Sequence, residues 1–158
     1  MFRELVRIKK KLSPEECMRV LQNETRGVLS VLGDDDYPYG MPMNHWYDEE
    51  DGCIYFHGGN YGHRLDALKK HDKVSFCVYD HGYRKEGEWA LNVKSVIVFG
   101  RMDMIRDTEK IVDITTKLSH KFTQDEEYIR KEIEENVQRT VLLKLTPEHL
   151  CGKLVNES

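Results

Sequence analysis

The sequence passes from a strand through a glycine-rich loop into a helix within one stretch, Ile54-Tyr55-Phe56-His57-Gly58-Gly59-Asn60-Tyr61-Gly62-His63-Arg64-Leu65-Asp66. Unpaired backbone N–H groups at the start of such a helix, with glycines that permit close approach, make an anion site. Arg64 adds a planar fork for two phosphate oxygens, and His63 adds a further donor. The stretch therefore predicts a site for a phosphate monoester around Gly62, His63 and Arg64.

Other interpretations of this loop stay open. No Gly-Lys-Ser/Thr follows the glycines, as in nucleotide triphosphatase loops, and no parallel strand-helix-strand unit surrounds them, as in dinucleotide-binding folds. The simplest alternative is a tight turn with a solvated Arg64 and a surface His63. Cys53, His57 and His63 have spacings outside the common zinc-finger patterns, so we expect no metal site.

The elements around this stretch predict a mainly β chain with helices. Ser13-Pro14-Glu15-Glu16 combines a cap, a proline at the first helical position and a capping box, so a helix begins there. Acidic turns that contain glycine separate three strands of an expected antiparallel meander, at 28–32, 39–46 and 53–57. Further helices are expected at 63–70, 107–122 and 125–137, and further strands at 74–79, 91–104, 141–145 and 150–155.

About seven short strands with helices between them indicate an antiparallel barrel decorated by helices. The segment Val96-Ile97-Val98-Phe99 is apolar on both of its faces. One face can fill the barrel, but the other must be covered by a helix or by a second subunit. We therefore expect a homodimer.

Length and composition suit a single domain over residues 1–158, with a basic N-terminal arm at residues 1–12. No apolar run approaches the roughly 20 residues that cross a bilayer. The N-terminus lacks the apolar core of a signal peptide, and the four cysteines are widely spaced, so we expect a cytoplasmic protein with reduced thiols.

The net charge of −4 argues against nucleic-acid binding. The basic arm is interpreted as solvated or wrapped around a partner subunit, and duplex binding through it is a further hypothesis.

A series of segments carries a resemblance to a known family. They are Gly27-Val28-Leu29-Ser30, Tyr37-Pro38-Tyr39 with Pro42-Met43-Asn44, Ile54-Tyr55-Phe56-His57, Gly62-His63-Arg64-Leu65-Asp66, Lys94-Ser95-Val96-Ile97-Val98-Phe99-Gly100-Arg101, and Thr146-Pro147-Glu148-His149-Leu150 with Gly152-Lys153. In this order the chain resembles the nitroimidazole-resistance branch of the pyridoxamine 5′-phosphate oxidase-like, FMN-binding split-barrel family. The resemblance runs from about Arg3 to Lys153. It implies a split β-barrel of six to seven antiparallel strands and a homodimer with two FMN sites at its interface.

The resemblance also implies which segments meet the cofactor. The strand that runs past the flavin ring, with backbone groups at the ring edge, corresponds to Pro42, Met43, Asn44 and His45. The segment that reaches the ribityl chain and the ring corresponds to Phe56, His57 and Gly58. The basic residue that holds the phosphate corresponds to Arg64, and a segment near the same cofactor corresponds to Lys94 and Ser95.

The function implied by the resemblance is that of an FMN-dependent oxidoreductase acting on a small organic substrate, either nitroimidazole reductase-like or pyridoxamine 5′-phosphate oxidase-like. His57 is the candidate catalytic residue because the family's histidine faces the ligand pocket, where it could donate a hydrogen bond or a proton. The alternative for His57 is a strand-end histidine bonded to a backbone carbonyl. No arginine-bearing substrate tail follows Lys153, so pyridoxamine phosphate is not the expected substrate.

A second hypothesis comes from a different functional class. The sequence offers no compelling acid–base or nucleophile pair. The chain could therefore be a carrier or sensor that binds flavin or haem without turnover.

Overall fold

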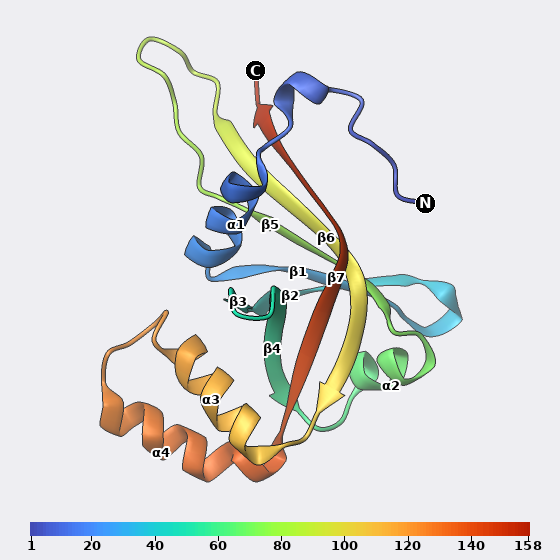
Figure 1. The fold of residues 1–158 in the computed structure, drawn as a ribbon, viewed down its shortest axis with the longest axis vertical. Coiled ribbons are helices and arrows are strands. Elements are labelled where there is room, and N and C mark those ends of the chain that lie inside the picture. The colour runs from blue at the N-terminus through green and yellow to red at the C-terminus, as the bar shows by residue number, and fades with distance from the viewer.

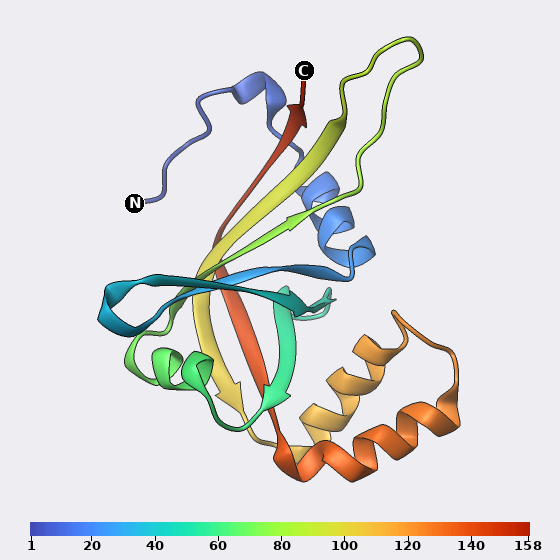
Figure 2. The same cartoon turned by 180° about the vertical axis from the view of Figure 1, so that it is seen from behind.

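All seven strands form one antiparallel sheet in the computed structural model, which describes residues 1–158 (Figures 1 and 2). The strands are β1 (Arg26–Leu32), β2 (Pro38–Asn44), β3 (Trp46–Asp48), β4 (Cys53–Gly59), β5 (Lys73–Tyr79), β6 (Asn92–Ile105) and β7 (Thr140–Asn156). The α-helices are α1 (Pro14–Asn23), α2 (His63–Lys70), α3 (Thr108–Ser119) and α4 (Glu126–Asn136), with short 3-10 turns η1 (Ile8–Lys10), η2 (Asp34–Asp36) and η3 (Val137–Arg139). The predicted fold class, an antiparallel split β-barrel of six to seven strands decorated by helices, is confirmed, and the seven strands form a curled half-barrel.

The strands at the two edges of the sheet follow each other directly in the chain. In the strand order β2-β1-β5-β6-β7-β4-β3, β2 pairs with β1 at one edge and β3 pairs with β4 at the other, and only His45 separates β2 from β3. A flat sheet of seven strands would hold these edges roughly 29 Å apart. The sheet therefore has to curl for one residue to join them. The expected meander with a single strand over 39–46 is wrong, because the chain changes pairing partners at His45.

The last part of the chain is one long strand instead of the two expected at 141–145 and 150–155. β7 pairs with β6 along its length, and a register shift beside Gly100 leaves Glu148 as the extra residue of a β-bulge. The backbones approach closely at this bulge, because a Cβ on Gly100 would overlap the carbonyl oxygen of Thr146. The bulge lets the strand continue through residues that look like a loop in the sequence.

Alternating residues of β4 pack into two separate cores. Ile54 and Phe56 fill the barrel interior, where the Phe56 ring meets the Phe76 ring edge-on at 4.8 Å between centroids. Tyr55 packs on the other side of the strand, beneath α3, in a smaller cluster with Cys53, Ile111, Ile114 and Leu142. Because strand side chains alternate, His57 follows Tyr55 on the helical side.

The helices begin where their capping residues predict. The Glu16 backbone N–H donates to Ser13 Oγ at 3.2 Å, and the Ser13 N–H donates to Glu16 Oε2 at 3.0 Å, which completes the capping box of α1. Helix α3 is capped by Asp107 and ends at Ser119, earlier than the expected residue 122. No helix in the structure combines the length and the apolar character needed to cross a membrane.

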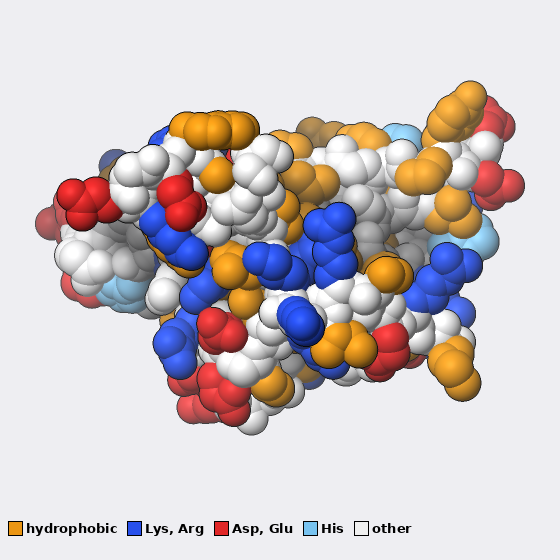
Figure 3. All heavy atoms as spheres, turned by 90° about the horizontal axis from the view of Figure 1, so that it is seen from above, with side chains coloured by type: hydrophobic (Ala, Val, Ile, Leu, Met, Phe, Trp, Pro, Cys, Tyr) orange, Lys and Arg blue, Asp and Glu red, His pale blue; other side chains and the backbone are white.

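The N-terminal arm lies near the C-terminal end of β7 (Figures 1 and 2). Phe2 stacks on His149 with 4.7 Å between ring centroids and approaches Phe99 at 5.5 Å, and Lys11 forms an isolated bridge with Lys153. Figure 3 shows this end of the molecule, with Lys and Arg side chains gathered across the middle of the surface. The arm therefore packs against its own sheet in the single protomer.

Gly100→Ala should lower the free energy of unfolding by about 2 kcal/mol, because the new Cβ collides with backbone and the long β6–β7 pair has to shift. Urea unfolding followed by circular dichroism measures the change. Gly59→Ala is the matched control, since a Cβ at Gly59 meets nothing within 4 Å. Equal stability of the two variants would show that the bulge tolerates a side chain.

Candidate functional site

A hollow of about 420 Å³ opens where β1, β2, β4 and α2 come together. Its lining includes Arg26, His57 and Arg64 but no carboxylate, and the remaining residues are Pro42, Met43 and Asn44. Two permanently charged guanidinium groups therefore face one hollow without an acidic partner in its wall. Such an arrangement attracts an anion.

Arg64 is the half-buried cation of this hollow. Its Nη1 lies 3.1 Å from the sulfur of Met43, a weak acceptor, and its buried Nε has no hydrogen-bond partner. Burial lowers the pKa of Arg64 from its usual value. A Cβ on Gly58 would overlap the guanidinium, so the glycine leaves the space that Arg64 occupies. A buried guanidinium without a carboxylate is costly unless an anion completes it.

The start of α2 provides the backbone part of the predicted anion site. Gly62 precedes the helix with φ of +118°, a conformation that strongly favours glycine, and no side chain caps the helix. The first N–H groups of α2 therefore have no intrahelical partner. The His63 side chain lies elsewhere: it stacks on Tyr39 at 4.5 Å and accepts a hydrogen bond from the Asp34 backbone N–H at 3.2 Å. It secures the β1–β2 turn, so only the backbone of His63 can contribute to the predicted anion site.

His57 lies between two hollows. Besides the Arg64 hollow, it lines a larger cavity of about 630 Å³ between the end of β4 and the α3–α4 hairpin, whose apolar wall includes Ile111, Ile133 and Val137. Partial burial of the imidazole is the main cause that lowers the pKa of His57, and the positive charge of Arg64 is the second. The residue still keeps an exposed face. The imidazole makes no hydrogen bond within the chain. The alternative of a histidine bonded to a backbone carbonyl is not what the structure shows.

Two predicted residues direct their side chains into the core instead. Phe56 is fully buried in the barrel, and His45 is equally buried, with Nε2 donating to the carbonyl of Leu21 at 2.7 Å. Burial, followed by the charge of Lys121, lowers the pKa of His45 to about 4. Lys121 Nζ donates to the carbonyls of Glu24 at 2.6 Å and of His45 at 3.0 Å, and burial lowers the pKa of this lysine to about 8. Phe56 and His45 can meet a ligand only through their backbones.

Lys94 and Ser95 are not brought to the hollow within one protomer. Lys94 Nζ lies 3.4 Å from Glu16 Oε1, and its backbone N–H donates to Asp80. The part of β6 nearest α2 is Arg101, because it pairs with the start of β5, which follows α2 in the chain. Lys94 lies roughly 23 Å away from Arg101 along β6. Only a second subunit could bring this segment to a shared ligand.

Arg26 is the site residue that the sequence interpretation missed. It lies directly opposite Asn44 in the β1–β2 pair, and its Nε donates to Asn44 Oδ1 at 2.9 Å. The pairing register that places both residues at the hollow was the missing information. The wall formed by the α3–α4 hairpin was missed as well, because helical periodicity does not reveal which strand a helix covers.

A model of the pyridoxamine 5′-phosphate oxidase family matches residues 13–154. The chain belongs to this family. No curated protein sequence matches the chain.

Solved structures share the fold of this family member at low sequence identity. A candidate 5-nitroimidazole antibiotic resistance protein from Bacteroides thetaiotaomicron is 16% identical, with a TM-score of 0.79 over 92% of this chain and 87% of that one. An FAD-binding protein from Mesorhizobium loti is 22% identical, with a TM-score of 0.71 over 92% and 97%. An FAD- and haem-binding protein from Mycobacterium smegmatis is 18% identical, with a TM-score of 0.72 over 94% and 74%. At these identities the likeness establishes the fold.

The buried His45 should make stability depend on pH. Its pKa is about 4 in the folded chain against an ordinary 6.5, so below pH 6.5 the unfolded chain binds a proton that the folded chain excludes. The free energy of unfolding therefore falls between about pH 6.5 and pH 4, by up to about 3 kcal/mol from this group. Urea unfolding at a series of pH values should show a flatter dependence for His45→Gln. The control His71→Gln alters an exposed histidine and should keep the wild-type slope.

Proposed function

We propose that this chain is an FMN-binding oxidoreductase of the pyridoxamine 5′-phosphate oxidase family that acts on a small organic molecule. The proposal rests on the environment of Arg64. Its guanidinium is half-buried, its Nε has no hydrogen-bond partner, and the hollow around it contains no carboxylate. Arg26 adds a second positive charge, and the start of α2 adds backbone N–H groups. A phosphate monoester supplies the two negative charges that these groups lack. The names of the FAD-binding proteins from Mesorhizobium loti and Mycobacterium smegmatis support a flavin as its carrier.

The residues around the hollow fit FMN in distinct roles. Arg64 would bind the phosphate with Arg26 beside it, and the absence of a side chain at Gly58 leaves room for the Arg64 guanidinium against β4. The backbone of Pro42, Met43 and Asn44 would follow the edge of the ring. The bound flavin would supply hydride or electron exchange, which no side chain of the chain provides.

His57 is the proposed substrate-side group. Its lowered pKa keeps the imidazole neutral near pH 7, so it can donate one hydrogen bond and accept another. It faces the 630 Å³ cavity under the α3–α4 hairpin, which is large enough for a small organic substrate beside the cofactor. Nitroaromatic reduction is one version of this proposal, supported by the name of the Bacteroides thetaiotaomicron protein.

The second candidate function is flavin or haem binding without turnover. It is favoured by His57, whose imidazole forms no hydrogen bond or ion pair, although Glu132 and Tyr128 line the same cavity. The name of the FAD- and haem-binding protein from Mycobacterium smegmatis supports the haem version. An absorbance spectrum separates flavin from haem. Steady-state oxidation of NADPH or NADH, with candidate acceptors added to fully flavin-loaded protein, separates an enzyme from a carrier.

A homodimer is part of the proposal. An apolar row crosses four neighbouring strands on the outer face of the sheet in the pairing order Val28, Cys77, Ile97 and Cys151. Val28 and Phe99 are 39% and 38% exposed in the single protomer, which suits a face that a second copy covers. Such a partner could bring its Lys94 and Ser95 to the neighbouring hollow. A cytoplasmic location also stays a prediction, and the four free thiols support it.

Arg64→Glu should reduce flavin retention by about tenfold or more, because it sets a carboxylate against the phosphate. The measurement is the ratio of flavin absorbance to protein after gel filtration. Arg64→Lys keeps the charge and should retain part of the flavin, while Arg106→Glu changes an exposed arginine outside the hollow and should retain all of it. Full flavin occupancy in folded Arg64→Glu would rule out this anion site.

Ile97→Asp should convert the proposed dimer into a monomer, because it places a charge in the middle of the apolar row. Sedimentation velocity measures the mass. The control Phe122→Asp changes a residue that is 50% exposed and lies outside the row, and it should leave the dimer intact. A monomeric wild-type protein would contradict the proposal directly.

A further inference from the structure

The outer face of the sheet carries two cations and no carboxylate. Pairing register sets one row of residues on each side of the apolar row. The basic row, on the side of the Arg64 hollow, consists of Asn44, Arg26, Tyr79, Ser95 and Lys153 on β2, β1, β5, β6 and β7. The aromatic row, on the other side, consists of Gly40, Ser30, Ser75, Phe99 and His149 on the same strands. None of the three rows contains an acidic residue.

Lys153 is the cation of this face without a counter-charge. The residue is exposed, and its side chain forms no ion pair or hydrogen bond within the chain. Burial raises the pKa of the Cys77 thiol, and the positive charge of Lys153 opposes that rise, so the ammonium lies close to the apolar row. A second copy on this row would enclose the ammonium. An enclosed ammonium is costly unless an anion lies beside it.

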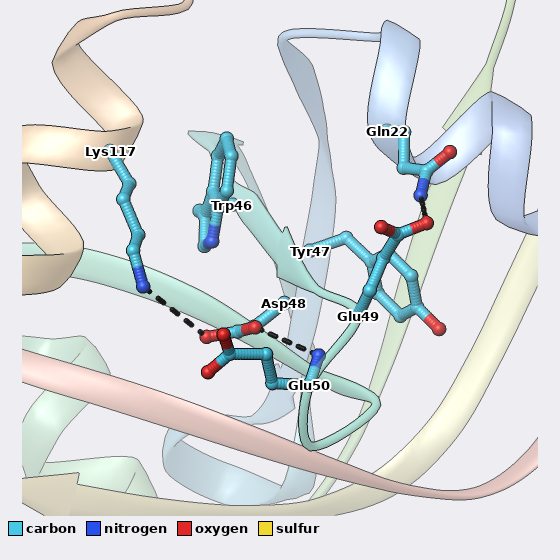
Figure 4. A pocket seen from close by; sticks show the side chains of 7 residues that line it. All are labelled: Gln22, Trp46, Tyr47, Asp48, Glu49, Glu50 and Lys117. Atoms are coloured by element: carbon cyan, nitrogen blue, oxygen red, sulfur yellow. Dashed lines mark hydrogen bonds and ion pairs between the residues drawn. The ribbon is translucent and has the colours of Figure 1, made fainter.

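Acidic residues near these strands are engaged elsewhere. Glu148, in the β-bulge of β7, is bound by Arg101 at 2.9 Å. The acidic β3–β4 turn at residues 48–50 faces a cavity between the end of α1 and α3, where Lys117 Nζ lies 4.0 Å from Asp48 Oδ2 (Figure 4). A second copy presents the same outer face and brings no carboxylate to it. A bound anion is therefore the group that can compensate the ammonium.

One two-fold axis makes this face complementary to itself. An axis along β5 sets β6 of one copy opposite β1 of the other, and β7 opposite β2. Phe99 then faces Ser30 of the partner subunit. The Phe2 ring, stacked on His149, faces Gly40 of the partner subunit, so large side chains meet small ones. An axis across the strands would instead set β7 on β7, where the two Phe2-bearing arms would meet, so the face favours the axis along β5.

The same axis brings the basic row of the second copy to the Arg64 hollow. Ser95 of the partner subunit lies opposite Arg26, and Lys153 of the partner subunit lies opposite Asn44. Arg26 and Asn44 both line the hollow. Packed sheets are roughly 10 Å apart, a gap that an extended lysine and a phosphate group bridge together. The ammonium that lacks an anion therefore meets the hollow that attracts one.

We infer that Lys153 of the partner subunit completes the anion site, as a third cation on the phosphate that Arg64 and Arg26 bind. This inference rests on the proposed flavin-binding dimer and names a residue that the second copy adds to its site. The phosphate then compensates charges from both copies. Without the phosphate, Arg26 and Lys153 of the partner subunit repel each other, so flavin binding and dimerisation support each other.

Mixed dimers decide which copy supplies the lysine. Copies with Arg64→Glu and copies with Lys153→Glu are co-expressed under different affinity tags, and dimers with one of each are purified on both tags. If Lys153 acts across the interface, one site of the mixed dimer carries both changes and the other carries neither. We expect each homodimeric variant to lose flavin by about fivefold or more, and the mixed dimer to retain about half of the wild-type flavin. The measurement is the ratio of flavin absorbance to protein after gel filtration.

Lys131→Glu, at an exposed lysine of α4, is the control and should keep all of its flavin. A mixed dimer with no more flavin than the two homodimers, or full flavin in the Lys153→Glu homodimer, would overturn the inference. If Lys153→Glu forms no dimer, Lys153→Gln replaces it in the same exchange. A wild-type protein that is monomeric or does not bind added FMN contradicts the proposed function and the inference with it. A flavin-loaded wild-type dimer without rescue in the mixed dimer contradicts the inference alone.

Gly40→Phe tests the axis by a route that does not involve flavin. The new side chain has room within the protomer, because the nearest atoms to a Cβ lie at 3.4 Å, but it would collide with the partner's Phe2. Sedimentation velocity over a concentration series should show dimerisation weakened by about tenfold or more. The control Gly59→Phe adds the same ring outside the face, where a Cβ meets nothing within 4 Å, and should leave the dimer intact. Unchanged dimerisation of Gly40→Phe would also overturn the inference.

Discussion

The closure of the sheet through His45 is the constraint on which the rest of the structure depends. Because one residue joins strands at opposite edges, the sheet must curl, and the ends of β2 and β4 arrive beside α2. The His45 side chain secures the junction from inside, bonded to Leu21 of α1 and packed edge-on against Phe76. The position of the hollow therefore follows from the way in which the barrel closes.

Two arginines show how the fold separates structural charges from those available to a ligand. Arg101 binds both oxygens of Asp72 at 2.9 Å and Glu148 at the same distance, so its capacity for carboxylates is used within the chain. Arg64 is more buried, but its guanidinium has only the weak acceptor Met43 sulfur as a hydrogen-bond partner and no ion pair. Burial of a charge without compensation is tolerated where a ligand supplies the compensation. The contrast between these residues supports the assignment of the anion site better than charge alone does.

Local signals predicted local structure well, and long-range pairing limited the rest. The capping box at Ser13 fixed the start of α1, and the strand-loop-helix stretch placed Arg64 correctly at a helix start. The break at His45 has no glycine or proline to mark it, because it arises from a change of pairing partner. Pro147 looked like the end of a strand, but the bulge beside it accommodates a residue without an N–H. Arg26 was missed because pairing register is a property of two distant segments.

The Lys121 ammonium gives the helical hairpin a role in the integrity of the barrel. It follows α3 and holds two carbonyls, one before β1 and one at the β2–β3 junction. The α3–α4 hairpin, which lies between β6 and β7 in the chain, is thus hydrogen-bonded to the junction between the two edge strands. Loss of these helices would remove both hydrogen bonds, so we expect the hairpin and the barrel to unfold as one cooperative unit, with amide protons at the end of α3 exchanging through global opening.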